Sequence, residues 1–106
     1  MKNSKNWEQN LKKFRKELDK IDEKICLLLG KRFEITRKIG KLKKKYKLKP
    51  EDKKREQEIL LRVSKKAKLL NFSEELIQKI YKLIFKYVKE EHGQSKRSKN
   101  TDKRKI

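Results

Sequence analysis

The chain has 106 residues, of which 33% are hydrophobic and 47% charged, and its formal net charge is +20. This length allows one domain at most. So few apolar residues would give a single copy a thin core, so we expect two or more copies to share one. Three Gly and one Pro argue against β structure and for helices with few turns. No apolar run is long enough to span a membrane, and the N-terminus lacks the apolar region of a signal peptide, so we expect a cytoplasmic protein without membrane association.

The positive charge would attract any polyanion or small dianion, and it also fits a nucleic-acid-binding protein. Most lysines are expected to line solvated helix faces. Because Lys greatly outnumbers Arg, each Arg is more informative than each Lys. The single cysteine excludes an internal disulfide and a Cys-based zinc site. With no metal-ligand spacing and no phosphate-binding loop, no cofactor is expected.

The first predicted helix covers about residues 8–45. Its apolar side chains recur at steps of three and four, the spacing of a heptad seam. The seam consists of Leu11, Phe14, Leu18, Ile21, Ile25, Leu28, Ile35, Ile39, Leu42 and Tyr46. Such a helix is roughly 50 Å long or more and needs a partner helix, most simply its own copy. Arg32 occupies one seam position, where a buried guanidinium requires an anion.

The second and third predicted helices are shorter and cover about residues 51–69 and 73–92. Pro50 fits the start of the second helix, and Ser73 is a suitable N-cap for the third. The second helix carries an apolar stripe of Ile59, Leu60, Val63 and Ala67. The third carries a wider apolar face of Leu76, Ile77, Ile80, Tyr81, Leu83, Ile84, Tyr87 and Val88. Residues 93–106 are expected to form a basic, disordered tail.

A few charged residues stand out from the solvated background. Lys43 lies close to the helix face of Arg32, eleven residues further on. Asp52, Arg55 and Glu56 share one face at the start of the second helix, and the preceding turn would fold that face toward Lys43. Alternatively, these three residues form an ordinary row of surface salt bridges.

Arg15 lies seventeen residues before Arg32, about 25 Å along one helix, so the two cannot hold one small ligand within a chain. In an antiparallel dimer of the long helices, Arg15 can reach the partner's pocket. The residues therefore predict a homodimer with two pockets, each with several cations and a pair of carboxylates. Such a pocket suits a small dianion that carries a hydroxyl group.

Four segments resemble, in order, the all-α (AroQ-class) chorismate mutases. They are Leu11–Ile25, Leu28–Ile35, Ile39–Lys43 and Pro50–Glu56. The resemblance extends over about residues 8–92. It implies an all-α fold with one long, one short and one medium helix in an intertwined homodimer, with residues 1–92 as the mutase domain. It also implies the pericyclic conversion of chorismate to prephenate in phenylalanine and tyrosine biosynthesis.

The same resemblance implies roles for individual residues. Arg15 of one subunit and Arg32 of the other would bind the substrate carboxylates, because a guanidinium binds a carboxylate in bidentate fashion. Lys43 would contact a carboxylate and the ether oxygen of the breaking bond. Asp52 and Glu56 would orient the ring hydroxyl.

Arg55 would complete the charge arrangement at the pocket edge.

The third predicted helix departs from the family pattern. Val88 stands where the family often has a small polar residue, so one substrate hydrogen bond should be absent. His92 stands where a Gln or Glu hydrogen-bonds the ether oxygen. His92 could donate that bond, or it could be an exposed residue at a frayed helix end. Glu91 or Gln94 could also be the partner of the ether oxygen.

Other functions stay open from the sequence. An isochorismate–pyruvate lyase or an aminodeoxychorismate mutase would use the same scaffold. A non-catalytic basic helical dimer could be regulatory or bind nucleic acid, although the low share of Arg and the few aromatic residues disfavour nucleic acid.

Overall fold

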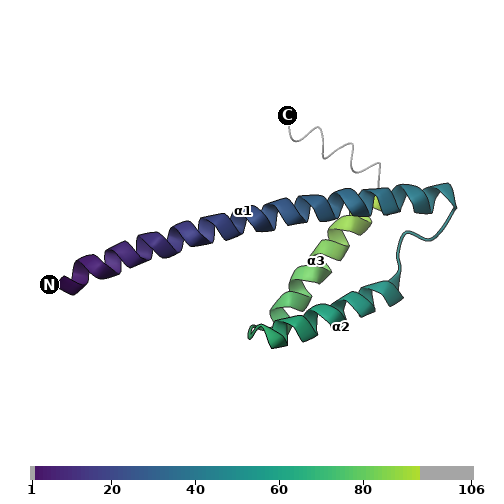
Figure 1. Ribbon diagram of the computed structural model, residues 1–106. Coiled ribbons are helices and arrows are strands. Elements are labelled where there is room, and N and C mark those ends of the chain that lie inside the picture. Colours follow the sequence, from purple (N-terminus) through teal and green to yellow (C-terminus); the bar gives the residue numbers. More distant parts are fainter. Residues whose placement is uncertain (1, 94–106) are drawn as a thin grey trace. The chain divides into compact units, whose positions relative to one another are not determined.

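The computed structural model describes residues 2–93, which form three helices and no strand (Figure 1). The helices are α1 (Lys2–Lys45), α2 (Lys53–Leu69) and α3 (Glu74–Gly93). The predicted all-α class is therefore confirmed. α1 begins six residues earlier than expected, because neither Gly nor Pro interrupts its first turns. α3 includes Gly93, and the remainder of the expected tail lies outside the described residues.

The starts of α2 and α3 are fixed by side chains that cap the helix. Asp52 is the N-cap of α2, and its Oδ1 accepts a hydrogen bond from the Arg55 backbone N–H at 3.1 Å. α2 therefore begins at Lys53 rather than at residue 51, and Pro50 lies before the helix instead of in its first turn. At α3, the Leu76 backbone N–H donates to Ser73 Oγ at 3.0 Å, which confirms the predicted cap.

α1 and α2 both end in a Schellman motif with a left-handed residue. Lys47 (φ 56°) and Asn71 (φ 68°) occupy that position. At the end of α1 the Leu48 N–H donates to Lys43 O at 2.8 Å, and at the end of α2 the Phe72 N–H donates to Ala67 O at 3.0 Å. Asn tolerates this conformation well, whereas in Lys it brings the Cβ too close to the backbone carbonyl oxygen.

The chain divides into two compact units, one ending at Ile35 and one beginning at Thr36. The first unit consists of the larger part of α1. Its seam is uncovered, with exposed fractions that run from 38% at Leu11 to 62% at Leu28. The short remainder of α1 shares the second unit with α2 and α3.

α2 and α3 pack against each other and supply the small core of the second unit. Its buried apolar residues are Ile59, Ala67, Ile84 and Phe85. Ser64 is also buried, and its Oγ accepts a hydrogen bond from Gln78 Nε2 at 2.7 Å. The predicted stripe of α2 thus faces the core, but half of the predicted apolar face of α3 does not. Leu76, Ile80, Leu83 and Tyr87 are exposed in the single chain.

Within residues 2–93, no helix combines the length and the apolar character that a membrane crossing requires.

Candidate functional site

The turn between α1 and α2 returns the chain to Lys43. The Lys43 Nζ donates a hydrogen bond to the carbonyl oxygen of Pro50 at 3.1 Å. The Schellman motif at the end of α1 makes this return possible, because its left-handed residue reverses the chain within a few residues. The Lys43 ammonium group therefore lies at the entry to α2, next in sequence to Glu51 and Asp52.

The three charged residues at the start of α2 have separate partners. Asp52 caps the helix through Oδ1. The Arg55 guanidinium lies 3.4 Å from the Glu58 carboxylate, and both side chains are 55% exposed. Glu56 is more covered, with 24% of its side chain exposed, and it faces α3. The alternative of an ordinary row of surface salt bridges holds only for Arg55, whose partner is Glu58, because the three side chains form no ion pair with one another.

Lys89 of α3 is the cation that the structure adds to this region. Its Nζ lies 2.6 Å from Glu51 Oε2 and 3.6 Å from Glu56 Oε2. The hydrogen bond with Glu51 raises the pKa of Lys89 and lowers the pKa of Glu51. Sequence reasoning missed Lys89, because in so Lys-rich a chain only its place three residues before His92 sets it apart.

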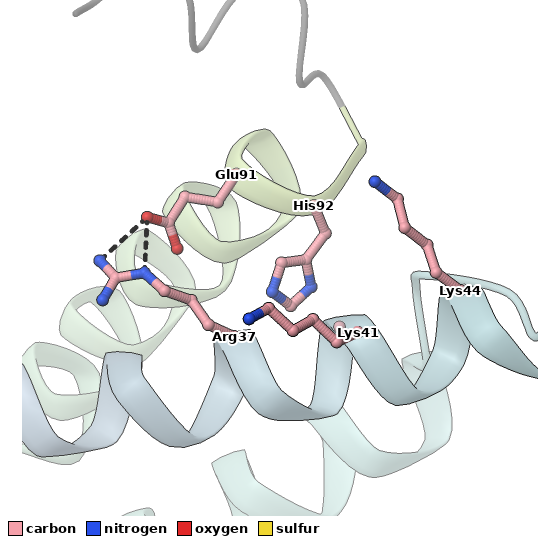
Figure 2. Close-up of a pocket in the computed structure, with 6 residues that line it drawn as sticks. Arg37, Lys41, Lys44, Glu91 and His92 are labelled. Carbon is pink, nitrogen blue, oxygen red and sulfur yellow. Dashed lines mark hydrogen bonds and ion pairs between the residues drawn. The ribbon is translucent and has the colours of Figure 1, made fainter.

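A second cluster surrounds His92 at the end of α3 (Figure 2). It lines a pocket of about 260 Å³ between α3 and the last turns of α1. The lining residues are Arg37, Gly40, Lys41, Lys44, Glu91 and His92. The three cations recur at steps of four and three, so they lie on one face of α1. Nothing in the sequence separates Lys41 and Lys44 from the other lysines.

Glu91 connects α3 to α1 in this cluster. Its Oε2 accepts hydrogen bonds from Arg37 Nε at 3.3 Å and Nη2 at 3.1 Å, and a third from the Tyr87 hydroxyl at 3.0 Å. The bond to Glu91 raises the pKa of both Arg37 and Tyr87. Glu91 was one of the alternatives to His92 as the partner of the ether oxygen, and its Oε2 instead joins α3 to α1. Its Oε1 is buried and accepts no hydrogen bond within the described chain.

His92 lies with its ring against α1 at Gly40. A Cβ built on Gly40 would stand 2.7 Å from His92 Nε2, closer than two such atoms can approach. His92 is half-buried rather than exposed, and within residues 2–93 its Nε2 has no hydrogen-bond partner. Buried polar atoms usually have a hydrogen-bond partner, so this ring nitrogen is an exception that needs an explanation.

The remaining site candidates are distributed over α1 and α3. Arg15 is exposed and Arg32 is half-buried, both in the unit that ends at Ile35. Val88 is half-buried on α3, one turn before His92. Gln94 lies outside the described residues.

The second unit therefore places Lys43 against Pro50 at the entry to α2, and it pairs Glu56 in the first turn of α2 with Lys89. His92 lies in the neighbouring cluster, and Lys43 is not among the residues that line its pocket. In residues 2–93 no group of three or more His, Cys, Asp or Glu side chains could hold a metal ion. Ammonium groups, guanidinium groups and carboxylates without a nucleophile suit the binding of a small anion that bears a hydroxyl group.

The three helices and this polar set define a small helical protein of the chorismate mutase class. The family model "Chorismate mutase type II" matches residues 14–93, and the chain belongs to this family. The match spans Arg15 to His92, so it includes every residue of the expected site.

A curated relative agrees with this assignment. The bifunctional chorismate mutase/prephenate dehydratase of Aquifex aeolicus (strain VF5) is 38% identical over 79 residues. The matched part is 72% of this chain and 22% of the relative, so the chain spans about a fifth of that protein. No solved structure matches the chain significantly.

Proposed function

We propose that the chain is a chorismate mutase that converts chorismate to prephenate in phenylalanine and tyrosine biosynthesis, in the cytoplasm. The family match over residues 14–93 is the observation that carries this proposal. The name of the relative joins a mutase to a prephenate dehydratase, and only the mutase activity is proposed for this chain.

The rearrangement is intramolecular and needs no nucleophile. The protein can accelerate it by holding the compact conformer of the substrate and by stabilising negative charge that develops on the ether oxygen. Lys43 and His92 are the proposed donors to that oxygen. Lys43 reaches the entry to α2, and the His92 ring nitrogen has no hydrogen-bond partner in the described chain.

Other residues bind and orient the substrate in this proposal. Arg32 holds one carboxylate, and Asp52 and Glu56 orient the ring hydroxyl. Arg55 completes the charge at the pocket edge. Val88 contributes only apolar contact, because its side chain cannot donate a hydrogen bond.

The proposed enzyme is a homodimer, and Arg15 acts in the partner's pocket. The uncovered seam of α1 supports this, since nine apolar side chains on one face of the helix, and Tyr46 just after its end, are exposed in the single chain. Burying them against a second copy would supply the core that one chain lacks. Arg15 lies on this same helix, where the antiparallel partner can use it.

The decisive experiment is an assay of chorismate disappearance and prephenate formation with the purified protein. We expect saturable turnover that is lost in Arg32→Ala. Arg62→Ala is the matched control, because Arg62 is an exposed cation of α2 outside the proposed site, and it should keep full activity. A folded helical dimer that does not turn over chorismate would overturn the proposal. Isochorismate and nucleic acid would then be the next ligands to test.

A further inference from the structure

Lys89 is unusual among the lysines of α3 because it bonds to another helix region. Its Nζ is shared by Glu51, which precedes α2, and by Glu56, in the first turn of α2. By contrast, Lys79 pairs within α3 with Glu75, and those side chains are 72% and 79% exposed. An exposed pair of that kind contributes little, whereas Lys89 and its two carboxylates are between 24% and 42% exposed.

The position of Glu56 raises an electrostatic difficulty for a dianionic substrate. A carboxylate that accepts the ring hydroxyl must lie close to two substrate carboxylates, which repel it. Glu51 and Asp52 add further negative charge at the same turn. A cation held against Glu56 would reduce this repulsion and would fix the carboxylate in one orientation.

We propose that Lys89 is a positioning residue that holds Glu56 in place to accept the ring hydroxyl of the substrate. The ammonium group approaches Glu56 Oε2 and leaves Oε1 for the hydroxyl donor. Glu51 anchors the ammonium group through its shorter contact of 2.6 Å. The inference deepens the proposed function and rests on it, because Glu56 needs an orientation only if it binds substrate.

The test compares Lys89→Met with Lys89→Arg and with the matched control Lys86→Met, which removes the same charge from α3 without breaking a described ion pair. We expect Lys89→Met to lower kcat/KM by about tenfold, because the Glu56 carboxylate loses the ion pair that orients it. Lys89→Arg should restore most of the activity, and Lys86→Met should keep all of it. Circular dichroism and thermal melting show whether each variant is folded.

Two further measurements separate positioning from a merely structural tie between α2 and α3. In a Glu56→Gln background, Lys89→Met should cause no additional loss, because the carboxylate that Lys89 is proposed to position is already gone. With a substrate analogue that lacks the ring hydroxyl, Lys89→Met and the wild type should have equal kcat/KM. If Lys89 only tied α2 to α3, Lys89→Met would lower kcat/KM in the Glu56→Gln background and also with the analogue. Direct contact of Lys89 with a substrate carboxylate would have the same two effects.

The failure of this inference can be told apart from failure of the proposed function. If the wild type turns over chorismate and Lys89→Met matches it, only the role of Lys89 is overturned. Losses that add in full to those of Glu56→Gln also overturn it. If the wild type turns over no chorismate, both the proposed function and the role of Lys89 fall together.

Discussion

The His92 ring of α3 lies against Gly40 of α1, so that a Cβ built at position 40 would stand 2.7 Å from His92 Nε2. Only glycine leaves room for the imidazole ring in the position the structure gives it. Glu91, the neighbour of His92, is bonded to Arg37 on the same face of α1. The end of α3 is therefore held to α1 by the Arg37–Glu91 ion pair and by the packing of the His92 ring on Gly40.

We expect Gly40→Ala to separate activity from stability. Alanine favours a helix interior over glycine by about 1 kcal/mol, so the melting temperature should be kept or raised. The new methyl group displaces the His92 ring, so kcat with saturating chorismate should fall by about tenfold if His92 donates to the ether oxygen. Steady-state kinetics and thermal melting on the same preparation measure both effects.

Gly30→Ala is the control for this substitution. A Cβ at Gly30 has nothing within 4 Å in the described chain, so this variant should gain the same helix stability and keep full activity. In a His92→Ala background, Gly40→Ala should have no further effect on kcat. Full activity of Gly40→Ala would contradict a catalytic role for the present position of His92.

Local chemistry made the three helices and the N-cap of α3 predictable. The N-cap at Ser73 and the apolar stripe of α2 follow from neighbours in sequence, and both are present. The start of α2 was misplaced by two residues because Pro50 and Asp52 both mark helix starts, and the hydrogen bond from the Arg55 N–H decides for Asp52. The uncovered seam of α1 matches the thin single-chain core expected from composition.

The charged contacts between helices were much harder to predict. Arg37, Lys41 and Lys89 resemble many other cations in the sequence, and only the crossing of α1 with α3 and the packing of α3 on α2 select them. The role of Gly40 was equally hard to predict, because the imidazole ring that packs against it belongs to His92, about fifty positions later. Side chains that act through tertiary contact leave no periodic signal.

The ion pair of Glu51 with Lys89 should make stability depend on pH in acid. The hydrogen bond from Lys89 holds the pKa of Glu51 below its ordinary value of 4.5. A lowered carboxylate pKa contributes stability that is present above the unfolded value and is lost as the pH falls through the folded one. The urea midpoint of the wild type should therefore fall more steeply below pH 4.5 than that of Glu51→Gln.

Glu90→Gln is the control for this titration, because Glu90 is exposed and bonds to no cation within residues 2–93. Its midpoint should follow the wild type as the pH falls. Since Glu51 is exposed, the difference should be small and should shrink in high salt. Parallel curves for the wild type and Glu51→Gln at low salt would show that the pair does not stabilise the fold.

Lys47 offers a stability test that does not involve the site. Its φ of 56° places a lysine Cβ in the left-handed region at the end of α1. We expect Lys47→Gly to raise the free energy of unfolding by about 0.5–1 kcal/mol, because glycine adopts this conformation without a Cβ clash. Urea denaturation measures the change. Lys49→Gly, at a position without a left-handed φ, should be neutral or destabilising, and a loss of stability in Lys47→Gly would contradict the reasoning.

The role of Arg15 in the partner's pocket can be tested by mixing two inactive proteins. Arg15→Ala and Arg32→Ala should each be nearly inactive, because each removes one guanidinium from every pocket. In a heterodimer of the two, one pocket receives both arginines and the other receives neither. After random exchange of equal amounts, about a quarter of the pockets should be intact. Prephenate formation should therefore recover to about a quarter of the wild-type rate.

A mixture of the wild type with the Arg15→Ala/Arg32→Ala double variant provides the matched control. If Arg15 acts in trans, every pocket of that heterodimer lacks one arginine, so exchange should halve the activity that the wild type brings to the mixture. If Arg15 acts within its own chain, exchange should leave that activity unchanged and the two single variants should not rescue each other. Native mass spectrometry of the mixtures establishes that subunits have exchanged. No recovery in an exchanged mixture of Arg15→Ala and Arg32→Ala would exclude action in trans.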